Sequence, residues 1–325
     1  MKFESKHRGR IGPAIEDAKE MRILNRIVTW TDNGIEYEGD QRHVEICMQN
    51  LGLEIDSREV GTPTDKDRRG VKEEEYLDQS SSTRYRGLVA RMNYLGQDRS
   101  DIQFTIKELS KDMANPTTAS MSRIKRLVRY LKGAPRYIIK MKYQSKPNSL
   151  TAWSDTDFAG CTKSRKSTSG GLVMHGSHVI KSWSTNQAVI ALSSGEAEYY
   201  GLVKAASVAI GVRTIANDMG IVLGGAIEIC SDASAAIGIA NRIGIGKVRH
   251  IEVNQLWLQQ KVACKEIVIT KVGTDDNLAD ALTKAVDAKS IEKHVHGTGG
   301  MVLTNRHRLA PKVSSHDELQ YESEE

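Results

Sequence analysis

The spacing of hydrophobic side chains changes once along this chain, near residue 149. Before that point apolar residues recur at helical spacing, for example at Tyr85, Leu88 and Met92, which predicts helices with one buried face. After it, short apolar runs are separated by glycines and polar turns, which predicts strands interrupted by helices. We therefore expect a mainly helical segment followed by an α/β domain.

The second part has a clear order of predicted elements. Strands are expected over residues 150–154, 170–175, 177–184, 227–231 and 266–272. Helices are expected over residues 193–218, 233–241, 252–263 and 277–286. Three antiparallel strands followed by alternating strands and helices are typical of a mixed five-stranded sheet with flanking helices.

The first part looks less complete. Residues 1–61 hold a hairpin signal at Asn33-Gly34 and a helical pattern over 41–51, and these pieces cannot bury much surface alone. Residues 61–79 are dense in charge and predict an exposed linker. Three helices are then expected, from Ser82, from Ile102 and after Pro116, followed by a strand over 137–143.

Charge is unevenly distributed, although the net charge is only +5. Residues 123–146 contain nine Lys or Arg residues and no Asp or Glu, which favours contact with an anionic partner such as nucleic acid. The alternative is an ordinary solvated helix face. The candidate binding residues are Arg123, Lys125, Arg126, Arg129 and Lys132. Residues 291–325 are expected to form a flexible tail, since their end is polar and acidic.

Several classes of protein are disfavoured by composition. No run of about 18 apolar residues is present, and the polar start does not resemble a signal peptide, so we expect no membrane association and an intracellular location. The four cysteines are far apart and lack zinc-ligand spacing, which predicts reduced thiols.

Four acids fall at the ends of predicted strands or near the starts of predicted helices. They are Asp155, Glu196, Asp232 and Asp280. Carboxylates delivered from separate elements suit Mg²⁺, a hard cation that prefers oxygen ligands, and this points to metal-assisted phosphoryl transfer.

Each acid also has a purely structural interpretation. Glu196 completes a capping box with Ser193, Asp232 could cap a helix, and Asp280 could serve a first helical turn. Asp157 competes with Asp155 for the strand-end position, because only one of them can face the other acids. We favour Asp155 and interpret Asp157 as a turn residue, and we expect Glu198 to be solvated.

The local motifs resemble the ribonuclease H domain of copia-type retrotransposon polyproteins. The matching stretches are Ser154-Asp-Thr-Asp-Phe-Ala-Gly160, Lys166-Ser-Thr-Ser-Gly-Gly171, Ala191-Leu-Ser-Ser-Gly-Glu-Ala-Glu-Tyr199, Arg249-His-Ile-Glu252 and Leu278-Ala-Asp-Ala-Leu-Thr-Lys284. Upstream, Tyr85-Arg-Gly-Leu-Val-Ala-Arg-Met-Asn-Tyr-Leu95 is similar to the segment that joins reverse transcriptase to ribonuclease H in such polyproteins.

The resemblance implies a domain order. Residues 1–61 would be a remnant of the reverse transcriptase palm and thumb, 62–148 a linker and basic connection segment, 149–290 the ribonuclease H domain, and 291–325 the tail. It further implies a location in the cytoplasm or in virus-like particles, with the nucleus as an alternative. The remainder of a reverse transcriptase would be a partner.

The resemblance also implies an activity, the hydrolysis of the RNA strand of an RNA–DNA hybrid with two Mg²⁺ ions, for which Mn²⁺ could substitute. Asp155 and Asp232 would hold the first ion, and Glu196 and Asp280 would complete the set. The polymerase aspartate pair is missing, since the single Asp-Asp, Asp275-Asp276, lies in a polar turn.

Some positions depart from the family pattern. Ala233 follows Asp232 where an Asn is usual, Leu256 replaces a second His, and Arg249 replaces the Lys before His250. Two roles are open for His250: shuttling of a proton in the reaction, or a purely structural one. A catalytically silent nucleic-acid-binding module and a non-functional relic of a retrotransposon therefore remain alternative interpretations.

Overall fold

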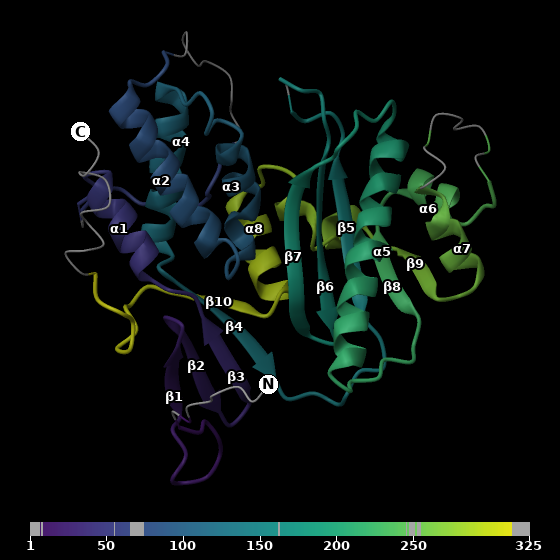
Figure 1. Cartoon of the computed structure of the whole chain (residues 1–325), viewed down its shortest axis with the longest axis horizontal. Coiled ribbons are helices and arrows are strands. Elements are labelled where there is room, and N and C mark those ends of the chain that lie inside the picture. The colour runs from purple at the N-terminus through teal and green to yellow at the C-terminus, as the bar shows by residue number, and fades with distance from the viewer. Residues whose placement is uncertain are drawn as a thin grey trace, which may run out of the picture.

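Two five-stranded sheets organise the chain (Figure 1). This computed structural model describes residues 7, 9–54, 56–65, 75–161, 163–244, 246, 251 and 255–313. The first sheet has the strand order β1-β2-β3-β4-β10, and the second has the order β7-β6-β5-β8-β9. None of the helices within these ranges is long and apolar enough to cross a membrane.

The first sheet is antiparallel throughout and combines segments from both ends of the chain. The predicted hairpin is confirmed at Asn33-Gly34, where Gly34 has a φ of +144°. Residues 1–61 are thus not an isolated fragment, because β4 and β10 extend their sheet. The strands are β1 (Glu20–Ile23), β2 (Arg26–Thr31), β3 (Gly34–Glu38), β4 (Arg136–Lys142) and β10 (Gly300–Leu303).

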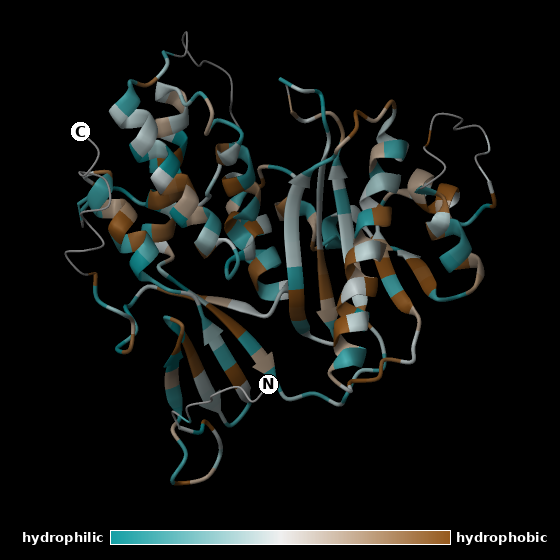
Figure 2. Ribbon diagram, in the orientation of Figure 1, coloured by the Kyte–Doolittle hydropathy of each residue, from teal (hydrophilic) through white to brown (hydrophobic). Residues whose placement is uncertain are grey.

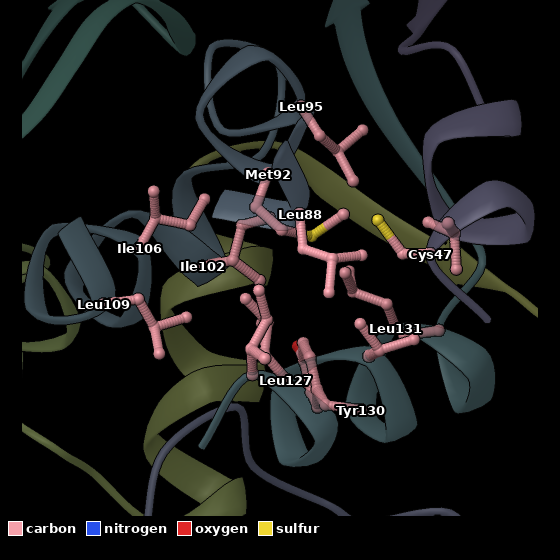
Figure 3. Packing of buried hydrophobic residues seen from close by; sticks show 14 of the residues in the cluster. Cys47, Leu88, Met92, Leu95, Ile102, Ile106, Leu109, Leu127, Tyr130 and Leu131 are labelled. Carbon is pink, nitrogen blue, oxygen red and sulfur yellow. The ribbon is translucent and has the colours of Figure 1, made fainter. Parts of the chain in front are cut away.

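A group of helices packs beside this sheet around one hydrophobic core (Figure 3). Cys47, Met92 and Leu131 come from three different helices and are fully buried. Burial of each large apolar side chain contributes about 1.5–3 kcal/mol, so the core is the main source of stability here. The helices are α1 (Arg42–Asn50), α2 (Gln79–Leu95), the 3-10 turn η1 (Ser100–Ile102), α3 (Gln103–Ser110), α4 (Thr118–Gly133) and α8 (Ala288–Gly297).

Helix α8 and strand β10 lie where a flexible tail was expected. Ile291 and Val295 of α8 are buried in the same core, and β10 pairs with β4. His294 is buried as well, and its ring nitrogens lie 2.8 Å from Leu278 O and 2.9 Å from Ser100 Oγ. The prediction of a flexible tail is therefore wrong from residue 291 to β10, while residues 314–325 lie outside the described part.

The second sheet confirms the predicted α/β architecture. Strands β5, β6 and β7 are antiparallel, and β8 and β9 run parallel to β5. The hairpin between β6 and β7 turns at Gly176, whose φ is +61°. Figure 2 shows hydrophobic segments along these strands, as expected for a sheet covered by helices. The strands are β5 (Thr151–Asp157), β6 (Thr168–His175), β7 (His178–Asn186), β8 (Ile227–Ser231) and β9 (Ile267–Lys271).

The helices of this part are α5 (Ser194–Asp218), α6 (Ser234–Ala240) and α7 (Trp257–Ala263). Helix α5 packs along the sheet through small and apolar side chains such as Leu202, Ala206 and Ala209. The helix expected over 277–286 is wrong, because the 3-10 turn η4 (Asp280–Leu282) forms there instead. Another 3-10 turn, η3 (Thr274–Asp276), precedes it. The Asn277 side chain bonds to the backbone of Ser154 and of Ala279, which favours the η4 turn over a helix.

Candidate active site

Asp155 lies near the end of β5, with a side chain that is 4% exposed. The Thr283 hydroxyl donates a hydrogen bond to Asp155 Oδ2. Burial raises the pKa of Asp155 to about 6; the Thr283 bond opposes this shift, and the negative charges of Asp280 and Asp232 add to it. Asp155 is therefore a carboxylate whose ionised form is costly unless a cation is near.

Asp232 follows β8, the parallel neighbour of β5, so the carboxyl ends of the two strands meet at one edge of the sheet. Asn277 connects the two acids, because its Nδ2 lies 3.5 Å from Asp155 Oδ1 and 3.5 Å from Asp232 Oδ1. The same nitrogen donates to Ser154 O at 3.1 Å. Asn277 thus fixes the two carboxylates relative to the strand end.

The η4 turn brings Asp280 to the same place. It packs so closely on β6 that a Cβ added to Gly170 would lie 2.7 Å from Leu282 Cβ, which explains a glycine there. Asp280 Oδ1 lies 2.8 Å from Lys284 Nζ. The negative charge of Asp280 adds to the raised pKa of Asp155, and the meeting of Asp155, Asp232 and Asp280 at one metal site stays a prediction.

Glu198, on the first turns of α5, is the fourth carboxylate of this cluster. It is partly buried, and burial, together with the charges of Asp155 and Asp232, raises its pKa to about 9. Its Oε2 is buried and accepts no hydrogen bond. The expectation that Glu198 is solvated is therefore wrong.

Glu196 serves the start of α5 instead. Its Oε2 accepts a hydrogen bond from the Leu192 amide at 2.7 Å, and its Oε1 accepts one from the Tyr200 hydroxyl at 2.8 Å. The Ser193 hydroxyl accepts from the Glu196 amide at 3.2 Å. The N-cap at Ser193 is thus as predicted, while the Glu196 carboxylate bonds to the amide of Leu192, one residue before the N-cap. Glu198 is the α5 glutamate whose pKa the charges of Asp155 and Asp232 raise.

The residues that follow Glu198 in the sequence indicate which side of α5 it lies on. Gly201 and Leu202 follow it by three and four residues, so all three share one helix face. Gly201 lies against β5, where an added Cβ would lie 3.1 Å from Ser154 Oγ, and Leu202 is fully buried. A glutamate on the sheet-facing side is the one that can reach the strand ends.

Asp157 behaves as a turn residue. Its carboxylate covers the backbone of Gly160, where an added Cβ would clash with it. Asp157 also attracts the partly buried Lys107 ammonium, which donates to Thr168 Oγ1 at 2.7 Å. The preference for Asp155 over Asp157 at the carboxylate cluster thus agrees with the geometry.

The basic residues of α4 are engaged within the chain. Arg126 and Arg129 donate to Thr62 Oγ1 and Arg58 O, at 2.9 and 2.5 Å, and Lys132 donates to Ser57 O at 2.7 Å. Residues 57, 58 and 62 therefore lie against this helix, just before and at the start of the expected linker. Residues 75, 76, 78 and 79 at its end are exposed, as predicted, and residues 66–74 lie outside the described part of the chain.

The remaining two candidates on α4 differ from each other. Arg123 pairs with Asp112, whereas Lys125 is exposed. The helix face that we proposed for nucleic acid is thus largely occupied by the chain itself.

The carboxylates fit a divalent cation by their chemistry. They are oxygen donors from four elements, two have raised pKa values, and Glu198 Oε2 accepts no hydrogen bond. Across the described ranges, however, no group of three or more His, Cys, Asp or Glu side chains is drawn together at metal-binding spacing. His250 lies outside the described residues.

Comparison with known proteins identifies relatives but no matching family model. The chain is 32% identical over 218 residues to the retrovirus-related Pol polyprotein from transposon RE1 of Arabidopsis thaliana, covering 67% of this chain and 15% of that protein. It is 34% identical over 203 residues to the corresponding RE2 polyprotein, covering 62% and 14%. The uncharacterized mitochondrial protein AtMg00810 of the same plant is 33% identical, covering 51% of this chain and 68% of that protein.

Weak likenesses to solved structures accompany these relatives. The N-terminal RNase H domain of Rv2228c from Mycobacterium tuberculosis is 17% identical with a TM-score of 0.31, covering 47% of this chain and 98% of that one. A foamy viral protease-reverse transcriptase in complex with an RNA/DNA hybrid is 12% identical with a TM-score of 0.42, covering 79% and 29%.

The strand order β7-β6-β5-β8-β9 with its flanking helices defines a mixed α/β domain, and the rest of the described chain combines a five-stranded antiparallel sheet with a group of helices. Its homologues are retrovirus-related Pol polyproteins from copia-type transposons. The chain spans 14–15% of the length of the two transposon polyproteins.

Proposed function

We propose that this chain hydrolyses the RNA strand of an RNA–DNA hybrid as the ribonuclease H part of a retrotransposon polyprotein. The observation that supports this most directly is the position of Asn277, whose Nδ2 lies 3.5 Å from both Asp155 Oδ1 and Asp232 Oδ1 at the ends of β5 and β8. Asp280 interacts electrostatically with Asp155, and Glu198 with both of these acids. A bound divalent cation relieves the repulsion among ionised carboxylates, and enzymes that cleave phosphodiesters use such sites.

Two Mg²⁺ ions, or Mn²⁺ in their place, would supply an activated water and stabilise the leaving oxygen. Asp155 and Asp232 would hold one ion between the ends of β5 and β8, while Glu198 and Asp280 would complete the ligand set. Asn277 and Thr283 hold the carboxylates in orientation through their hydrogen bonds. In the reaction, water attacks the phosphorus, the bond to the 3′ oxygen breaks, and a 5′-phosphate and a 3′-hydroxyl result.

Selectivity for RNA would come from contacts to 2′-hydroxyls and phosphates, since the shape of the hybrid and its sugars distinguish it from DNA. The proposed substrate partner is thus the hybrid itself, with the remainder of a reverse transcriptase as a second partner. Through the family, we also propose a location in the cytoplasm or in virus-like particles, with the nucleus as the alternative.

The test is cleavage of a labelled RNA–DNA hybrid with and without Mg²⁺. The parent should cut the RNA strand only with the metal, and Asp155→Asn and Asp232→Asn should each lose at least about 100-fold in rate, as expected when a charged ligand is removed. If both variants keep parental cleavage, the site assignment is wrong.

A catalytically silent nucleic-acid-binding module is the second candidate. Ala233 after Asp232 favours it, because a side-chain amide usual in the family is missing beside the site. Parental hybrid binding without any cleavage would select this function. A chain that shows no cooperative melting transition would instead be a non-functional relic.

A further inference from the structure

Lys284 is a cation that the carboxylate cluster already contains. Its Nζ lies 2.8 Å from Asp280 Oδ1, four residues earlier in the chain. Although burial lowers the pKa of Lys284, its hydrogen bond to Asp280 and the charges of Asp155, Asp280 and Asp232 together raise it. A lysine ammonium is positively charged at physiological pH, so Asp280 has a charged partner at 2.8 Å.

The effect of Lys284 extends beyond its direct partner. Thr283, the residue before Lys284, donates a hydrogen bond to Asp155, so the turn that carries the ammonium is held at the end of β5. The single positive charge of Lys284 does not neutralise all the carboxylates of the cluster. Glu198 Oε2, in addition, accepts no hydrogen bond. Lys284 thus supplies part of the positive charge that the cluster needs.

Lys284 is also able to move. Its side chain is 45% exposed, and a lysine is a compact point charge on a flexible four-carbon stem. The η4 turn that carries Asp280 is fixed separately, because Leu282 is fully buried and Thr283 bonds to Asp155. The ammonium can therefore leave the cluster while the backbone and the carboxylates stay in place.

We propose that Lys284 is a tethered counterion that stabilises the carboxylate cluster before metal binding and competes with the divalent cation for it. This inference rests on the proposed function, in that the competing cation is the one that function requires. Removing the lysine charge should make the unloaded protein less stable and its response to Mg²⁺ stronger. A purely structural lysine would change stability without changing the cation response.

The experiment measures the melting temperature of the full chain during a titration with MgCl₂, without nucleic acid. Lys284→Met should melt at a lower temperature without metal and reach half of its metal-induced shift at an Mg²⁺ concentration roughly 3- to 10-fold lower, as expected for the loss of one partly exposed like charge. Lys284→Arg keeps the charge and should resemble the parent more closely in both measurements.

Lys293→Met is the matched control. Lys293 of α8 pairs with Asp276 of η3 at 3.0 Å, and both side chains are exposed. Like the pair of Lys284 with Asp280, this pair lies C-terminal to β9. Its Mg²⁺ response should equal that of the parent. An unchanged or higher Mg²⁺ requirement in Lys284→Met would overturn the proposal.

The two inferences fail in different ways. If the parent shows no melting shift with Mg²⁺, the metal site of the proposed function fails. The counterion role is then decided without metal: a melting temperature lowered in Lys284→Met and retained in Lys284→Arg supports it, and equal values in both variants reject it.

Discussion

Glu196 and Glu198 are two residues apart on α5, and their carboxylates lie in different environments. Glu196 bonds to the Leu192 amide and the Tyr200 hydroxyl at the helix start, whereas Glu198 interacts with the charges of Asp155 and Asp232. Two steps along a helix rotate a side chain by about 200°, so the two glutamates cannot share one face.

This relationship predicts opposite outcomes for two matched substitutions. Glu198→Gln removes a charge from the cluster and should reduce hybrid cleavage at least about 100-fold. Glu196→Gln keeps the capping geometry and should retain cleavage within a few-fold, with a stability loss of about 0.5–1 kcal/mol. Cleavage rates and melting curves of the two variants are the measurement, and the reverse pattern would reassign the site to Glu196.

Without divalent metal, stability should fall as the pH rises from about 4 to 9, the Asp155 part by about pH 6 and the Glu198 part up to about pH 9. The pKa values of Asp155 and Glu198 are raised to about 6 and about 9 in the folded protein, so the folded state holds protons that the unfolded state has released. This contribution is complete below the unfolded pKa values of about 4 and is lost as the pH passes through the folded ones.

Glu198→Gln should flatten that dependence. We expect it to be more stable than the parent at pH 9 by about 1–2 kcal/mol, or roughly 2–6 °C in melting temperature, with little difference near pH 5. Melting in EDTA across this pH range is the measurement. Parallel pH profiles for parent and variant would show that Glu198 is not held in the charged cluster.

Shortening the chain should reveal the role of its last described elements. A variant that ends at residue 290 loses Ile291, Val295 and the pairing of β10 with β4, and should lose several kcal/mol, because each buried apolar side chain contributes about 1.5–3 kcal/mol. A variant that ends at residue 313 keeps these elements and is the control. Equal melting temperatures would mean that α8 and β10 add nothing to the first part.

The basic residues of α4 allow a test between two roles. Because Arg126, Arg129 and Lys132 bond to the segment 57–62, replacing all three with Ala should lower stability by about 1–3 kcal/mol. The slope of log affinity for hybrid against log salt should then change little. A slope flattened by roughly 1–3 units would instead show that these side chains neutralise phosphates, and Lys125→Ala, on the exposed face, is the single-residue comparison.

No DNA synthesis is expected from this chain. Asp275 and Asp276, the single Asp-Asp pair in the sequence, belong to the exposed turn η3 and not to a hairpin that could hold polymerase metals. A primed template with nucleotides and Mg²⁺ should therefore show no extension above background. Extension that disappears in a heat-treated sample would overturn this assignment.

The sequence by itself determined the second sheet and two of its acids. Period-two and helical patterns are local, so they located β5 to β9 and helix α5 without knowledge of the rest of the chain. The same patterns placed Asp155 and Asp232 at strand ends, whereas the parallel pairing of β5 and β8, which brings these ends together, is seen in the structure. The sequence also predicted a helix N-cap at Ser193. It left two roles open for Glu196, one in helix capping and one in catalysis.

Only the tertiary structure decided which residues complete the site. Asn277 and Thr283 lie more than 120 positions from the Asp155 that they contact, and no local pattern reports such a distance. The same holds for β10, which finds its partner in β4 after a long separation along the chain. The surroundings of Glu198 and Lys284 likewise depend on which side of their helix or turn packs on the sheet. Burial and nearby charge decide where such a side chain is stable, and residue spacing alone does not report them.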